Sequence, residues 1–187
     1  KCIFGSEIEC MEKNGNFKKD KLCTAPEIDL CNKTNKKTCV YGKDEAYFLD
    51  SCGNVANIYD SSKLNDNEYW SKYFTKNESC NSNSDNINSN SCGNCNYFLG
   101  SRCVSEGANV KCKDMNCPAS EATGNKERKN GESWCIYDAW TGDSRDVVGS
   151  RQWRKICVEG EVKVEPCADY RGQVCVQKPK GNTSFED

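Results

Sequence analysis

Hydrophobic residues are sparse along this chain, and only a few stretches repeat them with a regular period. The clearest helical pattern lies in residues 60–76. Its aromatic residues fall at helical spacing on one face, and they are Tyr69, Trp70, Tyr73 and Phe74. Ser61 or Ser62 can serve as the N-cap of this segment. The pattern therefore predicts a helix near residues 62–75.

The last third of the chain shows the alternation that is typical of strands. Four short segments carry it: residues 133–137, 153–157, 161–165 and 173–177. Glu159-Gly160 lies between the second and third segments, as expected for the two-residue turn of a hairpin. The sequence therefore predicts a β-rich C-terminal module over residues 133–178, followed by a polar tail over residues 179–187.

Polar stretches divide the rest of the chain. Residues 77–96 have the composition of a disordered tract, and we expect three cysteines to hold them as an exposed loop: Cys80, Cys92 and Cys95. Residues 119–132 are polar and end at the turn signal Asn130-Gly131, which predicts a linker or a long loop between two modules. Residues 1–118 are then one disulfide-rich N-terminal module or several.

Cysteine content changes this picture most. The chain has 16 cysteines in 187 residues, while only 36% of its residues are hydrophobic and the mean hydropathy is −0.85. An apolar core would be thin at this length, so disulfides are the expected supplement. The predicted fold is small and disulfide-rich, mainly β, with one short helix and much irregular structure.

The number of cysteines is even, which complete pairing into about eight disulfides requires, and such pairing indicates an oxidising compartment. All are predicted disulfide residues: Cys2, Cys10, Cys23, Cys31, Cys39, Cys52, Cys80, Cys92, Cys95, Cys103, Cys112, Cys117, Cys135, Cys157, Cys167 and Cys175. Several neighbours enclose seven residues, which favours local pairs: Cys2–Cys10, Cys23–Cys31, Cys31–Cys39, Cys95–Cys103 and Cys167–Cys175. Twelve cysteines precede residues 119–132 and four follow, as two closed modules would require.

The charge balance and the absence of histidine exclude several functions. The chain has 26 Lys and Arg against 28 Asp and Glu, and phosphate binding needs a clustered positive surplus. We therefore expect no nucleic-acid partner. Without histidine the chain cannot form Ser-His or Cys-His nucleophile pairs. No apolar run approaches the length of a membrane span, so we expect no membrane insertion within this segment.

Cys92-Gly93-Asn94-Cys95 has the CxxC spacing of thioredoxin-like oxidoreductases and zinc ribbons. A zinc site would need two further ligands, for which Cys112 and Cys117 are the nearest pair. Structural disulfides are the favoured interpretation, with no metal and no cofactor. Three aspartates of one loop can offer oxygen ligands to calcium, although their spacing matches no EF-hand: Asp138, Asp143 and Asp146.

The C-terminal module also gathers candidate ligand-binding residues: Trp134, Trp140, Trp153, Arg151 and Arg154. Exposed Trp and Arg side chains are typical of sugar-stacking and protein-binding faces. In small disulfide-rich domains, however, aromatic residues usually replace the missing aliphatic core, and this second interpretation is favoured. Three Asn-x-Ser/Thr sequons are candidate glycosylation sites: Asn32, Asn77 and Asn182.

Hydrolysis by two carboxylates requires no histidine, so a secreted hydrolase stays an alternative. With 28 acidic residues no pair stands out, and a chain with a thin core rarely shapes a deep cleft. We therefore expect that the chain is not an enzyme.

Three stretches, residues 50–62, 78–104 and 130–176, resemble segments of the large cysteine-rich secreted proteins of small-genome symbiotic archaea of the DPANN type. The resemblance covers about half of the chain, with Cys, Gly and Trp in a fixed order and GSR and EPCADYR between them. The Lys/Asn-rich composition agrees with an AT-rich genome of that kind. The resemblance implies a cell-surface or host-contact location and carries over no catalytic residue.

Together these patterns predict an extracellular, cell-surface structural or adhesive segment that contacts protein partners or assembles with itself. The first alternative is a carbohydrate- or protein-binding module that uses the exposed Trp, Tyr and Arg side chains of residues 134–155, with glycans as possible ligands. The second alternative is the carboxylate-dependent hydrolase.

Overall fold

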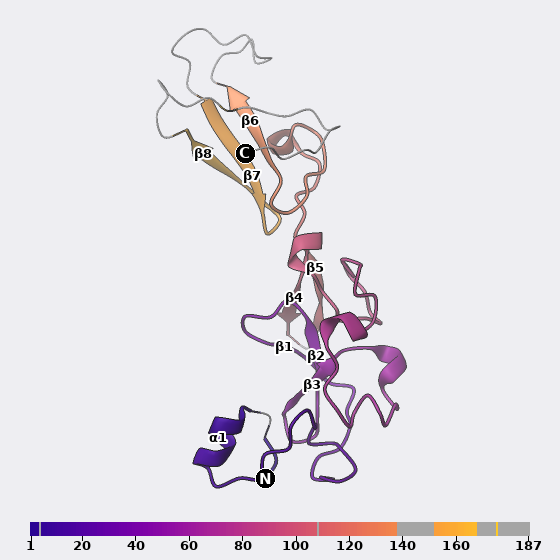
Figure 1. Ribbon diagram of the computed structural model, residues 1–187. Helices are drawn as coiled ribbons and strands as arrows, with labels where there is room; N and C mark the ends of the chain where they lie inside the picture. The colour runs from indigo at the N-terminus through magenta and orange to yellow at the C-terminus, as the bar shows by residue number, and fades with distance from the viewer. Residues whose placement is uncertain (4, 108, 138–151, 168–174, 176–187) are drawn as a thin grey trace. The chain divides into compact units, whose positions relative to one another are not determined.

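The computed structural model describes residues 1–3, 5–107, 109–137, 152–167 and 175. The chain divides into two compact units, Lys1–Asp114 and Met115–Asp187, which we call the first and the second unit (Figure 1). The described residues form three small antiparallel sheets, one short α-helix and several 3-10 turns. The predicted fold class, mainly β with one short helix, is confirmed.

The first unit contains a three-stranded antiparallel sheet of order β1-β2-β3. Its strands are β1 (Lys37–Cys39), β2 (Ala46–Leu49) and β3 (Val55–Ile58). Asp50 shapes the turn between β2 and β3, because its carboxylate accepts hydrogen bonds from the backbone N–H groups of Cys52 and Asn54. This local side-chain bonding stabilises a tight turn and brings β3 back beside β2.

A hairpin of β4 (Ser101–Glu106) and β5 (Asn109–Asp114) completes the strands of this unit. Cys103 on β4 lies opposite Cys112 on β5, but the two do not bond to each other. Cys103 bonds instead to Cys39 of β1. This disulfide ties the hairpin to the three-stranded sheet.

The predicted helix near residues 62–75 is wrong. The segment begins with a single 3-10 turn, η1 (Ser61–Lys63), and continues as further turns. The Asp60 side chain caps η1 by accepting a hydrogen bond from the Ser62 N–H, so neither predicted serine is the cap.

Asn57 on β3 explains why no helix forms. Its side-chain amide donates to the backbone carbonyls of Tyr69 and Lys72, and its side-chain oxygen accepts from the Phe74 N–H. These backbone groups are thereby satisfied by a buried side chain instead of by helical partners. A tertiary contact has overridden the local helical pattern.

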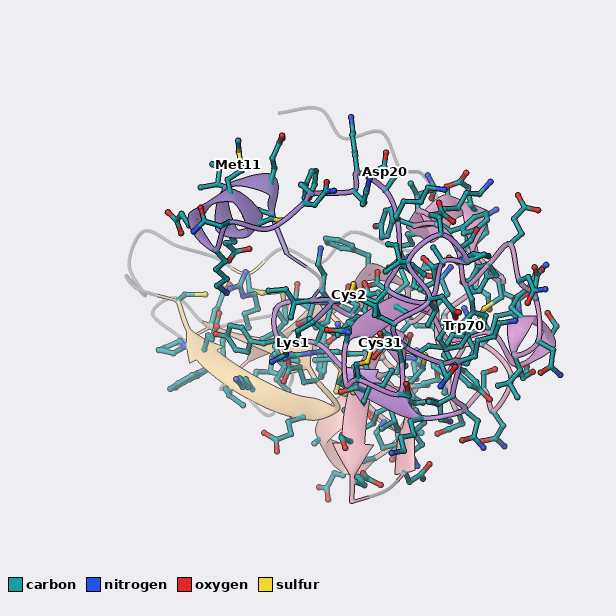
Figure 2. All side chains as sticks on the ribbon, turned by 90° about the horizontal axis from the view of Figure 1, so that it is seen from below. Lys1, Cys2, Met11, Asp20, Cys31 and Trp70 are labelled. Carbon is teal, nitrogen blue, oxygen red and sulfur yellow. A yellow bond between two sulfur atoms is a disulfide. The ribbon has the colours of Figure 1, made fainter. Side chains whose placement is uncertain are left out.

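The α-helix of the described residues is α1 (Glu7–Glu12), which the hydrophobic pattern did not predict. Ser6 and Glu9 form a capping box at its N-terminus. None of its residues is buried, and Ile8 and Met11 are exposed. Figure 2 shows Met11 projecting away from the other labelled side chains. Its cap, and not packing, stabilises α1.

The core of the first unit consists of two small clusters. One is mostly aromatic, and its buried members are Leu22, Phe48, Ala56, Tyr69 and Trp70. The other is mostly half-cystine, and its members are Ala46, Cys95, Cys103, Val110 and Cys112. Phe48 packs against Trp70 with 4.8 Å between ring centroids. Aromatic rings and disulfides supply the interior that aliphatic residues fill in larger cores.

The second unit contains an antiparallel sheet of order β6-β7-β8. Its strands are β6 (Ser133–Tyr137), β7 (Gln152–Val158) and β8 (Glu161–Pro166). Glu159 and Gly160 join β7 to β8 with φ values of 53° and 87°, as a type I′ turn requires. The predicted strand over β6 and the predicted hairpin are therefore confirmed.

Residues 119–132, for which the sequence left a linker and a long loop open, form a loop that packs within the second unit. The 3-10 turn η4 (Glu121–Thr123) buries Thr123, and the Arg128 guanidinium lies 4.6 Å from the Trp134 ring centroid. The division between the units falls after Asp114, ahead of the predicted module end at residue 118. Apart from Cys175, the predicted strand over residues 173–177 lies outside the described residues.

Seven disulfides cross-link the chain: Cys2–Cys23, Cys31–Cys52, Cys39–Cys103, Cys80–Cys92, Cys95–Cys112, Cys117–Cys157 and Cys135–Cys175. Cys10 and Cys167 are unpaired, so the predicted pairing of all sixteen cysteines is not found. None of the predicted local pairs forms. Tertiary packing is the reason, because it brings cysteines of distant segments together, as for Cys39 of β1 and Cys103 of β4, which belong to different sheets and have a sequence separation of 64.

The predicted closed modules of twelve and four cysteines are also wrong. Cys117 pairs with Cys157 across residues 119–132, because the loop and β7 belong to one unit. The first unit therefore holds eleven cysteines and the second holds five. Each unit has an odd number and retains one unpaired thiol.

Candidate functional site

Trp134, the first of the predicted ligand-binding residues, belongs to the core of the second unit. It is only 6% exposed and packs with Cys117 and Cys157. Arg128 lies over its ring, in the geometry of a cation–π contact. The interpretation that aromatic residues replace aliphatic core is therefore confirmed for Trp134.

The other predicted ligand-binding residues are not gathered on one described surface. Trp153 and Arg154 are neighbours on β7, so the alternation of side chains places them on opposite faces of the sheet. Trp153 is half-buried, and Arg154 forms an ion pair with Glu165. Trp140 and Arg151 lie outside the described residues.

The most exposed aromatic side chains of the described residues lie in the first unit. Phe98 is 93% exposed, and Tyr41 is fully exposed. Phe98 is the middle residue of the 3-10 turn η3 (Tyr97–Leu99), in which Leu99 is also exposed. We call residues 96–100, which contain this turn, the stapled tip.

Hydrogen bonds hold the backbone of the stapled tip. The Asn96 side chain accepts from the Phe98 N–H and thereby caps η3. Gly100 ends the turn at a φ of 103°, where a side chain would be strained. The buried Ser101 hydroxyl accepts from the Asn96 N–H and donates to the Asp85 carbonyl. None of these bonds involves the Phe98 ring, which meets the ring of the neighbouring Tyr97 edge-on at 6.3 Å between centroids and otherwise stays exposed.

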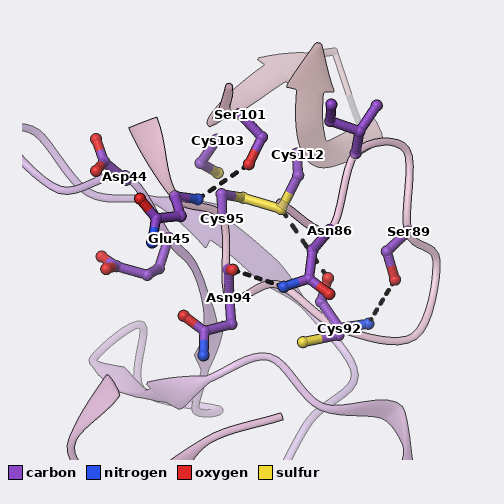
Figure 3. The surroundings of a disulfide bond; sticks show 12 residues. Asp44, Glu45, Asn86, Ser89, Cys92, Asn94, Cys95, Ser101, Cys103 and Cys112 are labelled. Carbon is purple, nitrogen blue, oxygen red and sulfur yellow. Dashed lines mark hydrogen bonds between the residues drawn. A yellow bond between two sulfur atoms is a disulfide. The ribbon is translucent and has the colours of Figure 1, made fainter. Parts of the chain in front are cut away.

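Two disulfides flank the stapled tip and give it its name. Cys95 precedes the tip and bonds to Cys112 of β5 (Figure 3). Cys103 follows the tip and bonds to Cys39 of β1. With both ends cross-linked to strands, the tip keeps one conformation at a low entropic cost.

The turn between β1 and β2 is joined to the stapled tip. The Asp44 carboxylate accepts a hydrogen bond from the Tyr97 N–H at 3.3 Å, and the Asp44 carbonyl accepts from the Cys103 N–H at 2.6 Å. Tyr41 lies in this same turn, next to Gly42 with a φ of 75°. Two exposed aromatic side chains are thus carried by segments that hydrogen bonds connect.

The CxxC segment is structural. Its cysteines and the two nearest candidate zinc ligands are all in disulfides, which are Cys80–Cys92, Cys95–Cys112 and Cys117–Cys157. Zinc and redox chemistry both require a thiolate, which a disulfide sulfur does not supply. Cys92 and Cys95 do not pair with each other, so the segment is not a dithiol redox motif in this structure.

The polar tract over residues 77–96 is stapled by Cys80–Cys92 as expected, but it is only partly exposed. Asn86 and Asn94 are 6% and 1% exposed. The Asn86 amide donates to the Asn94 carbonyl at 2.8 Å (Figure 3). The Asn94 amide donates to the carbonyls of Lys76 and Cys80. Buried asparagine amides satisfy backbone carbonyls here, which the composition of the tract did not indicate.

Glu45, which flanks β2, forms a half-buried polar network with Lys76 and Tyr47. Lys76 Nζ lies 2.6 Å from Glu45 Oε1, and the Tyr47 hydroxyl donates to Oε2 at 2.9 Å. Burial would raise the pKa of Glu45, but hydrogen bonds from Lys76, the backbone and Tyr47 outweigh it and lower that pKa below its ordinary value. Burial and the Glu45 charge raise the pKa of Tyr47. The carboxylate stays ionised and paired, which suits a structural role.

One grouping of possible metal ligands occurs in the described part of the chain: Cys23, Cys31 and Asp50, within 4.8 Å of one another. Both sulfur atoms are in disulfides, and the Asp50 carboxylate accepts hydrogen bonds from its own turn. The grouping therefore offers no thiolate to a metal ion. The aspartates proposed as calcium ligands lie outside the described residues.

Two of the predicted glycosylation sites, Asn32 and Asn77, are exposed, and Asn182 lies outside the described residues. The described residues include no helix that is long and apolar enough to cross a membrane. No protein-family model, curated protein or solved structure matches this chain.

Sequence reasoning missed the stapled tip because residues 97–104 have a strand-like pattern. The strand begins only at Ser101, and the residues before it form η3. One local signal was present: Asn96 stands two residues before Phe98, and Gly100 follows, as a capped turn with a left-handed end requires. Which aromatic ring would be exposed depended on the packing around this turn.

Proposed function

We propose that this chain is a structural and adhesive segment at an extracellular surface, and that the stapled tip makes its contacts with protein partners or with further copies of the chain. Seven disulfides are typical of extracellular proteins, which supports the location. The resemblance to surface proteins of symbiotic archaea implies the same place. The proposal assigns no catalytic residue.

The single observation that carries the proposal is the 93% exposure of Phe98 on a capped turn between two disulfides. Burying a Phe side chain contributes about 1.5–3 kcal/mol, and an exposed ring leaves this contribution available to a partner. Because hydrogen bonds and two disulfides already order the tip, little conformational entropy is lost on binding. Aromatic anchors in preordered segments are the usual centres of protein interfaces.

Bead adhesion tests this function. Beads coated with the chain are mixed with one another, which measures self-association, and with cells before and after their surface proteins are removed by protease. We expect adhesion in at least one of the protein-dependent settings. Phe98→Ala is expected to weaken it roughly tenfold, the loss of about 1–2 kcal/mol that an aromatic anchor typically gives.

Ile8→Ala is the matched control, because Ile8 is 70% exposed on α1 and is not part of the stapled tip. It is expected to leave adhesion unchanged. Equal adhesion of the two variants would reject the stapled tip as the contact. Binding to a glycan array that Phe98→Ala abolishes would instead assign the tip to carbohydrate, whose apolar faces also stack on aromatic rings.

A further inference from the structure

Cys167 is an unpaired thiol in a unit that also contains two disulfides. The second unit holds five cysteines, and four of them form Cys117–Cys157 and Cys135–Cys175. Cys167 follows the last residue of β8 and is partly exposed. A thiolate that reaches a disulfide can exchange with it, so the position of Cys167 relative to the two bridges decides its chemistry.

Gln152, the first residue of β7, anchors both Cys167 and Cys175. The Cys167 N–H donates to the Gln152 backbone carbonyl at 3.1 Å. The Cys175 N–H donates to the side-chain oxygen of the same glutamine. One residue therefore holds the backbones of the unpaired cysteine and of a half-cystine at the same end of the sheet.

The strand register places Cys135 on the same face. Cys135 of β6 lies opposite Arg154 of β7, and Arg154 lies opposite Glu165 of β8. Side chains two positions apart on a strand share a face, so Gln152 shares the face of Arg154, and Cys167 shares that of Glu165. The electrostatics agree, because Glu165 and then Cys167 raise the pKa of Arg154.

We propose that Cys135, Cys167 and Cys175 form a thiol–disulfide exchange site in which Cys135–Cys175 and Cys167–Cys175 are alternative bridges. In the exchange, the Cys167 thiolate attacks Sγ of Cys175 and a new sulfur–sulfur bond forms. The bond between Cys175 and Cys135 breaks, and Cys135 leaves as a thiolate that takes up a proton from water. One disulfide replaces another, so no oxidant or reductant is consumed.

The two bridges have different structural consequences. Cys135–Cys175 has a sequence separation of 40 and ties β6 to the segment after β8. Cys167–Cys175 would have a separation of 175 − 167 = 8 and would leave β6 without that tie. A bridge over a longer loop restricts the unfolded chain more. The reaction therefore replaces the more stabilising Cys135–Cys175 bridge with the less stabilising Cys167–Cys175 bridge. The site is thus a built-in means to release Cys135 of β6 from Cys175.

Thiol trapping in Cys10→Ser tests the exchange, since Cys167 is then the unpaired cysteine. The variant is equilibrated without oxidant at pH values below and above the ordinary thiol pKa of about 8.5, and thiols are trapped with N-ethylmaleimide. Peptide mapping without reduction locates the label. We expect label at Cys135 as well as at Cys167, independent of protein concentration and appearing faster at high pH, because more of the attacking thiol is then thiolate.

The Cys117–Cys157 bridge of the same unit is the internal control, because Cys157 lies on the face of β7 opposite to Gln152 and Arg154. Label at Cys135 is expected to exceed label at Cys117 or Cys157 about tenfold or more. Label at Cys167 alone at every pH would overturn the proposal. Equal label at Cys117, Cys157 and Cys135 would also overturn it, since this result means unspecific shuffling.

A second variant tests directly whether the sulfur atoms of Cys167 and Cys175 can meet. Cys10→Ser/Cys135→Ser leaves Cys167 and Cys175 as thiols, and oxidised glutathione is added as the oxidant. Neighbouring thiols are expected to close the Cys167–Cys175 bridge with release of glutathione, so intact mass shows no attached glutathione. Stable mixed disulfides at both positions would show that the two cysteines do not meet, and would overturn the proposal.

Discussion

Buried polar side chains that satisfy backbone groups hold much of the first unit together. Asn57 is 1% exposed and fixes three backbone groups of the turn segment that follows β3. Glu45, 7% exposed, bonds to Lys76 and Tyr47. Paired in this way, buried polar groups stabilise a fold, whereas each unpaired one would cost about 1–3 kcal/mol.

Glu45 should make the free energy of unfolding depend on pH in the acidic range. Its pKa in the folded chain is lowered, so its contribution is fully present above the unfolded pKa of about 4.3 and is lost as pH falls through the folded value. We expect the free energy of unfolding to fall more steeply below about pH 4–5 in the wild type than in Glu45→Gln. Urea unfolding at a series of pH values measures this slope.

At neutral pH, Glu45→Gln should also cost about 1–3 kcal/mol, because Lys76 loses a charged partner. Glu7→Gln is the control, since Glu7 is exposed on α1. A Glu45→Gln protein with the same acid slope as the wild type would contradict this account.

Among the elements, those with local causes were predicted from the sequence and those with distant causes were not. The β7–β8 hairpin follows from Glu159 and Gly160, which adopt the positive φ values that a two-residue turn needs. The helix predicted near residues 62–75 fails because Asn57, outside the segment, bonds to its backbone. No periodicity within the segment carries that information.

Gly93 shows how closely the elements of the first unit approach. Its N–H donates to the Tyr59 carbonyl, and its carbonyl accepts from the Ala46 N–H at the start of β2. A Cβ at this position would lie 2.6 Å from the Ala46 carbonyl oxygen, a contact with rigid backbone. The glycine between Cys92 and Cys95 therefore serves close packing and not redox chemistry.

Gly93→Ala is expected to destabilise the chain by about 1–3 kcal/mol, because the strand or the CxxC segment must shift. Thermal unfolding followed by circular dichroism measures the effect. Gly5→Ala is the matched control, since its added Cβ would meet only the flexible end of the Glu9 side chain. Equal melting temperatures for the two variants would contradict the close approach.

For the whole molecule, the disulfides together contribute more than the usual net stability of a domain. A disulfide typically contributes about 2–4 kcal/mol, and net stabilities of domains are about 5–15 kcal/mol. Seven bridges in a chain with 36% hydrophobic residues therefore exceed the whole usual margin. Reduction should unfold both units.

Thiol counting tests this arrangement. Alkylation of the denatured, unreduced chain should add two groups, one at Cys10 and one shared between Cys167 and Cys135, and alkylation after reduction should add one at each of the 16 cysteines. The reduced chain should also lose its near-ultraviolet circular dichroism, which reports buried Trp70 and Trp134. Many more than two reactive thiols before reduction, or an intact signal after it, would contradict the role of the bridges.

Composition and short-range pattern by themselves determined the class of this protein: a disulfide-rich, mainly β chain with a thin core, a two-residue hairpin turn and aromatic core residues. Only the tertiary structure decided which cysteines pair, which aromatic ring is exposed and where the units divide. Local spacing favoured Cys167–Cys175, for example, whereas the fold joins Cys135 to Cys175. The physical reason is the sequence separation of the interacting residues. Turns and strands depend on neighbouring residues, whereas disulfides and burial depend on distant segments that meet only in the folded chain.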